Sequence, residues 1–143
     1  MLDYADIQTK AVTLLASVTA LNGASVEKDD GYSNTDVERA LRDDGFCVVV
    51  RLTTSIDAAE QAGAKMFGLG QTIIHLLENP HRNPETTGKK VSMSLAIAGV
   101  ISALSANDSE GERHFRITSV QLVNASPGLL EYEITAICPT SGN

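Results

Sequence analysis

The residues best able to do chemistry are three histidines and two cysteines, and one of the histidines lies in a regularly spaced pattern. His75, Glu78 and His81 follow one another at intervals of three, and their side chains are types that bind metal ions. However, the segment around His75 has the composition of a strand, in which His75 and Glu78 would point to opposite faces. The pattern also crosses Pro80 into a loop. We therefore expect no metal site and no cofactor, but a histidine on a sheet face and a solvated loop histidine.

Cys47 is the candidate nucleophile of the chain. It would need His75 or His114 beside it, because the thiolate is the reactive form and a neighbouring base generates it. Cys47 lies in an apolar run at 46–50, where cysteine usually behaves as a small buried hydrophobic residue. We therefore expect a structural or interaction role and no enzymatic activity. A small cytosolic α+β enzyme in which Cys47, His75 and His114 converge in a pocket remains the alternative.

Composition narrows the class of protein further. The chain has 143 residues, of which 43% are hydrophobic and 20% charged, enough for one domain with one core. Its net charge of −7 argues against tight nucleic-acid binding, because neutralising phosphates requires a basic surface. No apolar run approaches the roughly 20 residues that span a bilayer, and the first residues lack the pattern of a signal peptide. We expect a cytosolic origin, reduced cysteines and no membrane partner.

Hydrophobic periodicity and turn signals divide the chain into seven elements. Helices are expected at residues 4–21, 35–44 and 89–105, and strands at 46–54, 65–78, 115–122 and 129–138. The segments 24–34, 55–64 and 79–90 are expected to be loops or connections. The order α-α-β-β-α-β-β is met most simply by an α+β fold in which helices cover one face of an antiparallel-rich, four-stranded sheet.

Finer expectations concern individual elements. Asn22-Gly23 should stop the first helix, because Gly can take a left-handed cap. Gly68 and Gly70 predict a bulge or kink in the strand at 65–78, and a slip in the alternation near Ser119 predicts another bulge. The spacing of apolar residues in the last helix predicts a buried face made of Val91, Leu95, Ala98, Ile101 and Leu104.

Three stretches, taken together, resemble the tail terminator (tail completion) proteins of tailed bacteriophages. The first is the short helix Asp36–Leu41 that leads into the β-branched strand Gly45–Val50. The second is the strand that ends in Glu78-Asn79-Pro80-His81-Arg82-Asn83-Pro84 and is followed by Thr87-Gly88 and an amphipathic helix. The third is the hairpin turn Pro127-Gly128-Leu129-Leu130-Glu131-Tyr132. The resemblance covers nearly the whole chain in the order and length of its elements.

This resemblance implies a homohexameric ring that caps the finished tail tube, stops tube polymerisation and presents a face to the head-side connector. Its partners would be other copies of the chain, the tail tube protein and the connector or neck protein, and its location the virion, after assembly in the host cytoplasm. DNA would pass through the lumen without specific binding, which the acidic balance suits because acidic walls repel phosphate.

The loops at 55–64 and 79–90 are the expected contact segments of such a ring. The candidate residues are Asp57, Glu60, Gln61, His81, Arg82, Asn83, Glu85, Lys89 and Lys90. A head-closure or other neck component is the nearest alternative. A regulatory module that binds a small ligand is a third possibility beside the enzyme.

Overall fold

The computed structural model describes residues 4–29, 35–55, 69–83, 91–107 and 110–139. Three α-helices and five strands follow one another along these segments. They are α1 (Tyr4–Ala16), a short 3₁₀ turn (Thr19–Leu21), β1 (Ser25–Asp29), α2 (Thr35–Asp43), β2 (Phe46–Ser55), β3 (Leu69–Glu78), α3 (Met93–Ser105), β4 (Arg116–Ser126) and β5 (Leu129–Pro139).

The strands form one sheet in the order β1-β2-β3-β5-β4. β1 pairs with β2 in parallel, and the remaining neighbours are antiparallel. The α+β class is therefore confirmed, whereas the expected count of four strands is wrong by one. The additional strand is β1, inside the segment 24–34 that was expected to be a loop. Its sequence, SVEKD, has a single apolar residue because an edge strand is covered only in part.

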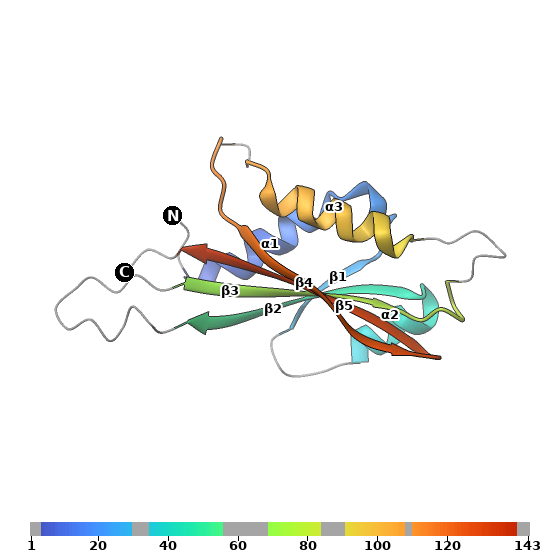
Figure 1. The fold of residues 1–143 in the computed structure, drawn as a ribbon. Helices are drawn as coiled ribbons and strands as arrows, with labels where there is room; N and C mark the ends of the chain where they lie inside the picture. The colour runs from blue at the N-terminus through green and yellow to red at the C-terminus, as the bar shows by residue number, and fades with distance from the viewer. Residues whose placement is uncertain (1–3, 30–34, 56–68, 84–90, 108–109, 140–143) are drawn as a thin grey trace.

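The main core lies between the sheet and the pair α1 and α3, which lie together on one side of it (Figure 1). Every second residue of the interior strands points into this core, as the two-residue repeat of a strand requires. Its largest fully buried members include Phe46, Val48, Val50, Ile74, Leu76 and Ile134 from the strands and Ile7, Leu15 and Leu104 from the helices.

The opposite face of the sheet carries α2, so the helices do not all lie on one face as expected. Ala40 of α2 is buried against Cys47, Val49 and Leu77, with Val37 and Leu41 beside it. The cause is the unbroken apolar run of β2. Consecutive residues of a strand point to opposite faces, so such a run needs cover on both sides.

The buried face of α3 differs from the expected one. Val91 and Leu104 are buried as expected, but the other buried residues of the helix are Met93, Ala96 and Val100. Leu95 is 63% exposed, Ala98 is exposed and Ile101 is half-buried. This helix is apolar on most of its circumference, so two different stripes satisfy the helical repeat and spacing alone cannot choose between them. The first helix also ends earlier than expected, at Ala16.

The turn residues behave largely as the sequence indicates. Asn22 and Gly23 do not stop the first helix, which has already ended at Ala16, but both have positive φ and they end the 3₁₀ turn that follows it. The bulge near Ser119 is confirmed by a register shift between Ile117 and Ser119, and β4 has a second shift between Leu122 and Asn124.

The bulge expected at Gly70 is wrong, and Gly68 lies outside the described residues. β3 pairs without a shift along both neighbours. Instead, a Cβ atom at position 70 would collide with the side chain of Ile7. Glycine here makes room for α1 rather than breaking the strand.

Candidate functional site

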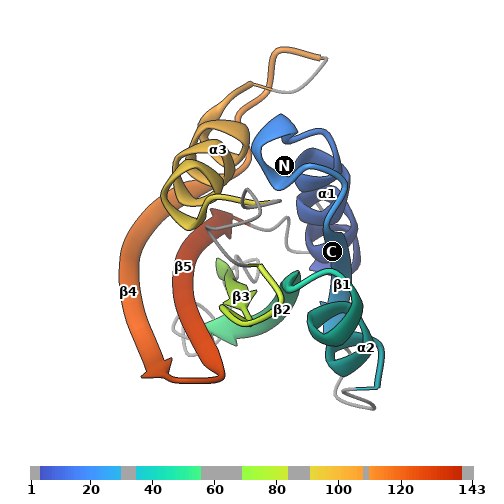
Figure 2. The ribbon, with the colours of Figure 1, turned by 90° about the vertical axis from the view of Figure 1, so that its right-hand side faces the viewer.

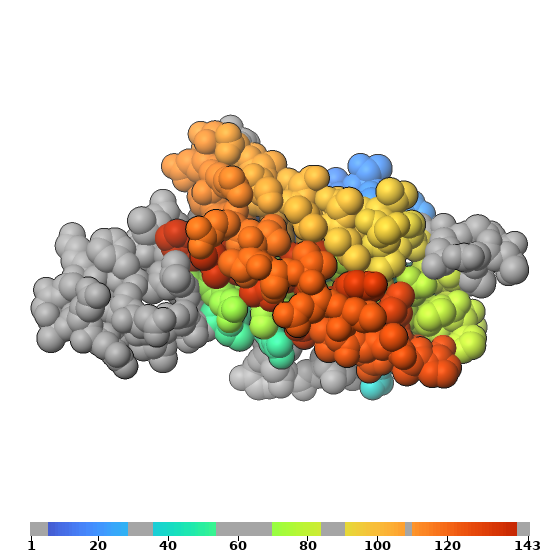
Figure 3. Space-filling model, in the orientation of Figure 1, coloured from blue at the N-terminus to red at the C-terminus, as the bar shows by residue number. Residues whose placement is uncertain are grey.

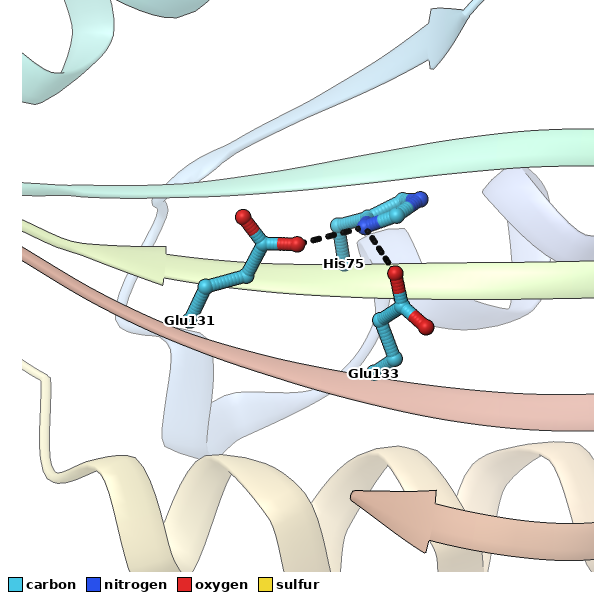
Figure 4. Close-up of side chains that lie close together, drawn as sticks. All are labelled: His75, Glu131 and Glu133. Atoms are coloured by element: carbon cyan, nitrogen blue, oxygen red, sulfur yellow. Dashed lines mark hydrogen bonds and ion pairs between the residues drawn. The ribbon is translucent and has the colours of Figure 1, made fainter. Parts of the chain in front are cut away.

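A histidine and two glutamates meet on the face of the sheet opposite the main core. His75 lies on β3, and Glu131 and Glu133 lie on the neighbouring strand β5 (Figure 4). The Nδ1 atom of His75 is 3.0 Å from Oε2 of Glu131 and 3.5 Å from Oε1 of Glu133. The side chains are 13%, 18% and 25% exposed, respectively, so the three groups are mostly shielded from solvent.

Strand pairing explains why these three side chains converge. His75 is the direct partner of Glu133 in the β3–β5 ladder, and Leu77 is the partner of Glu131. Glu131 and Glu133 are two residues apart, so both point to the face that carries His75. Side chains of directly opposed strand residues are close enough to interact, which places both carboxylates within reach of one imidazole.

A hollow of about 330 Å³ adjoins this cluster, between α2 and the sheet. His75 and Glu131 form part of its wall, and Arg51 of β2 is also there. The other lining residues are Val37, Glu38, Leu41, Val49, Leu77 and Leu129. The hollow exists because α2 covers only part of this face, and it leaves the cluster beside an open space.

One imidazole nitrogen and two carboxylates are a ligand set that divalent transition metals accept. The three ligand atoms lie within 4.8 Å of one another, and no other such group of His, Cys, Asp or Glu occurs in the described part of the chain. The pattern considered from the sequence, His75 with Glu78 and His81, is not brought together. Glu78 is 1% exposed on the core face, while His81 lies exposed in the turn after β3.

The cluster had a partial signal in the sequence. Glu131 and Glu133 alternate with apolar residues, which indicates that both share one face of a strand. The missing information was the pairing of β5 with β3, because the local sequence does not say which strands become neighbours.

The residues of the enzyme alternative do not converge. Cys47 is fully buried, and burial, followed by the negative charges of Glu27 and Asp44, raises the pKa of its thiol to about 12. A thiol with this pKa forms almost no thiolate near neutral pH, so Cys47 is a poor nucleophile. His114 lies beside Pro139, which pairs with the Leu69 end of β3, away from His75.

Three of the candidate contact residues lie in the described part of the chain, and they differ in exposure. His81 and Arg82 are exposed in the turn after β3, whereas Asn83 is 2% exposed. The amide of Asn83 donates to the carbonyl of Val91 over 2.8 Å, and its Oδ1 accepts from the backbone nitrogen of Val91 over 3.4 Å. The other candidates lie outside the described residues: Asp57, Glu60, Gln61, Glu85, Lys89 and Lys90.

The Asn79–Asn83 segment is a closed turn. The carbonyl of Asn79 accepts from the backbone nitrogens of Arg82 and Asn83 over 3.0 and 3.1 Å, and its side-chain Oδ1 accepts from the backbone of His81. The nitrogen of Asn79 donates to the carbonyl of Gly45 over 2.9 Å. The turn therefore fastens the end of β3 to the start of β2.

A second surface feature is apolar. Val120, Leu122 and Val123 of β4 are 42%, 53% and 49% exposed, and we call these three residues the β4 patch. β4 is the outermost strand next to β5, as Figure 2 shows, and the hairpin lies uncovered at the front of Figure 3. The exposed Leu95 belongs to α3, which contacts β4. The large apolar side chains that are exposed in the described part of the chain therefore come from β4 and α3.

Comparison with protein-family models and with curated proteins finds no match to this chain. Among solved structures, the fold is similar to that of a chain in the structure titled "Virion of native gene transfer agent (GTA) particle". The two chains share 17% sequence identity over 95% of the length of each, with a TM-score of 0.53. This likeness establishes a shared fold over nearly the whole chain. Within the described residues, no helix has the length and apolar character needed to cross a membrane.

Proposed function

We propose that this chain is a structural protein of a phage or phage-like virion that forms a homohexameric ring on the end of the tail tube. The ring stops tube polymerisation and joins the tail to the head-side connector, and DNA passes through its lumen. The likeness to a virion chain over 95% of both lengths supports the class. The resemblance to tail terminators, seen in the Asn79–Asn83 turn and the β4–β5 hairpin, supports the specific position at the end of the tail tube.

The observation that best supports ring assembly is the exposed edge of β4. An edge strand offers unpaired backbone N–H and C=O groups along its free side, which can pair with another chain. Here that edge also carries the β4 patch, and exposed apolar patches mark sites of protein contact. A closed ring needs one surface of each subunit to meet a different surface of the next. The β4 edge supplies one of these two surfaces.

The loop candidates retain their role within this proposal. His81 and Arg82 are exposed and free to contact a neighbouring subunit or the tube. Asp57, Glu60, Gln61, Glu85, Lys89 and Lys90 are proposed for the same contacts. Asn83 positions the chain before α3 rather than meeting a partner. The net charge of −7 suits a lumen that repels DNA.

Imaging of particles tests the proposed station. Particles made with and without the gene are compared by negative-stain electron microscopy. Headless tails of abnormal, variable length are the expected result without the gene. Tails of correct length beside unjoined heads would instead assign the chain to head closure or another neck position. Normal joined particles would refute the proposal.

The β4 edge is tested on purified protein. Val120→Asp combined with Leu122→Asp should abolish ring formation measured by light scattering after size-exclusion chromatography, because charge is placed in an apolar contact. Both side chains are exposed, so the fold should be retained. Thr13→Asp, at an exposed position of α1, is the matched control and should still assemble. Rings formed equally well by both variants would exclude the β4 edge as the contact.

A further inference from the structure

We propose that His75, Glu131 and Glu133 form a binding site for a divalent transition-metal ion, and that zinc is the ion that suits it best. The site goes beyond the proposed ring function and does not depend on it. Three ligand atoms, their scaffold, the local charge and access from solvent each support the assignment.

The distances between the ligand atoms match those that a metal ion imposes. Zinc binds nitrogen and oxygen ligands at about 2.0–2.2 Å, usually in a tetrahedron. Two ligands of a tetrahedron with these bond lengths are roughly 3.3–3.6 Å apart. The Nδ1 atom of His75 lies 3.5 Å from Glu133 Oε1, within this range, and 3.0 Å from Glu131 Oε2, slightly below it. Small side-chain movements would therefore place an ion between the three atoms.

The alternative to a metal is a set of hydrogen bonds centred on one proton, and it accounts for the cluster less well. A single N–H at Nδ1 can make one well-directed hydrogen bond, and the second contact, at 3.5 Å, is longer than good hydrogen bonds. One metal ion can bond to all three atoms together. The geometry of Figure 4, in which both carboxylates approach the same nitrogen, fits this arrangement.

The scaffold is rigid and the side chains are restrained. β3 and β5 are interior strands, and their ladder runs from Leu69–Pro139 to Glu78–Leu130 without a register shift. Each of the three side chains is at least three-quarters shielded from solvent. A site built on paired strands keeps its ligands closer to the productive geometry than a site on loops does.

Charge and access also favour a cation. Glu131 and Glu133 bring two carboxylates to the site, and Glu38 adds a third across the hollow. Arg51 is the cation among the described residues that line this hollow. The negative charge therefore exceeds the positive charge around the site. The hollow of about 330 Å³ admits an ion from solvent and has room for water as a further ligand.

Zinc titration of the full chain tests this proposal. Metal-free protein without an affinity tag is titrated with zinc chloride by isothermal calorimetry. One zinc ion per chain is the expected stoichiometry. His75→Ala should weaken binding by more than about 100-fold, the upper range for loss of a group that only supports a ligand. The matched control is His81→Ala, which removes an exposed histidine outside the cluster and should bind zinc as the unaltered chain does.

Conservative variants keep the test informative if His75→Ala does not fold. Glu131→Gln and Glu133→Gln preserve side-chain shape and should each weaken zinc binding by at least about tenfold. Cobalt(II) in place of zinc should give the visible absorption of a low-symmetry site, and this absorption should be lost in Glu133→Gln. Absence of zinc binding would overturn the proposal. Binding that survives in all three cluster variants, or that is lost in His81→Ala, would overturn it equally.

Discussion

The two faces of the sheet are built from the same strands but differ in what they bury. The face under α1 and α3 is apolar in its centre, where Ile74 and Leu76 of β3 are fully buried between the buried polar residues Thr72 and Glu78. The face under α2 buries a small apolar cluster and leaves His75 beside an open hollow. The side chains of residues 74 to 77 of β3 thus point alternately to the two faces. One face contains the main hydrophobic core, and the other contains the polar cluster His75, Glu131 and Glu133.

The helices explain this difference. α1 and α3 each have 13 residues and pack side by side, whereas α2 has 9 and stands alone. The sequence of α2, TDVERALRD, devotes most of its positions to charged side chains. Only Val37, Ala40 and Leu41 remain to pack on the sheet. A short amphipathic helix can cover part of a five-stranded sheet, and the remainder stays accessible.

The largest expected effect compares two adjacent leucines of β3. Leu76→Ala should lower the free energy of unfolding by about 4 kcal/mol, because it leaves a cavity between tightly packed neighbours. Leu77→Ala should cost about 2 kcal/mol, since it enlarges a hollow that is already open. Urea denaturation of both variants gives the comparison. Equal losses would show that the two faces are packed equally well.

The second prediction concerns the joint between α2 and β2. Gly45 has φ of 75°, and a Cβ atom there would lie 2.6 Å from the carbonyl carbon and oxygen of Arg82. Gly45→Ala should cost about 3 kcal/mol, because a left-handed conformation is unfavourable for alanine and the Asn79–Asn83 turn must also move.

Gly111→Ala is the matched control for this joint. Gly111 also has positive φ, at 82°, but nothing lies within 4 Å of the Cβ position. Its replacement should cost about 1 kcal/mol in thermal or urea unfolding. A similar loss at both positions would mean that the contact with Arg82 contributes nothing.

The third prediction tests how α3 is held on the core face. Asn83→Ala should cost about 2 kcal/mol, because it leaves the buried N–H and C=O of Val91 without their partner. Hydrogen exchange should rise at the start of α3, since Val91 lies two residues before Met93, the first residue of this helix. His81→Ala, two residues earlier and exposed, should change neither measurement. Unchanged exchange in Asn83→Ala would show that the core alone positions α3.

The last prediction concerns Cys47 under α2, whose replacement is not needed because its reactivity can be measured directly. In a Cys138→Ala background, Cys47 should react with a disulfide reagent at pH 8 at least about 100-fold more slowly than in the unfolded chain. Because the folded state keeps the proton that the unfolded state releases, stability should fall as pH rises from about 8.5 towards about 12. Leu41→Ala on α2 should speed the reaction, whereas Ile101→Ala on α3 should not. If Ile101→Ala speeds the reaction of Cys47 and Leu41→Ala does not, then opening of α2 does not control access to this thiol.

Local sequence predicts much of this fold. The alternation of Leu130, Tyr132, Ile134 and Ala136 predicts β5, and the turn at 126–128 predicts the β4–β5 hairpin. Each of these features depends on neighbours within a few residues. β1 and the buried stripe of α3 could not be predicted. β1 owes its extended form to pairing with β2, and α3 has two apolar stripes between which only the shape of the sheet decides.

The site was harder to predict than the fold for a similar reason. His75 and Glu131 are 56 residues apart in sequence, and they meet only because β5 lies between β3 and β4. A search for ligands near His75 in the sequence leads to Glu78, which points into the core face. Long-range pairing decides which polar groups share a face, and the single sequence does not specify it.

The position of β5 has a consequence for how the chain is made. Residues 129–139 are the last of the described elements to leave the ribosome, yet they occupy an interior place in the sheet and contribute Ile134, Ala136 and Cys138 to the core. β3 has no partner on that side until these residues emerge. A nascent chain that has completed α3 therefore holds an exposed apolar strand, and the sheet cannot close until residues 129–139 have been made. Before β5 emerges, the uncovered side of β3 is therefore open to chaperones and proteases.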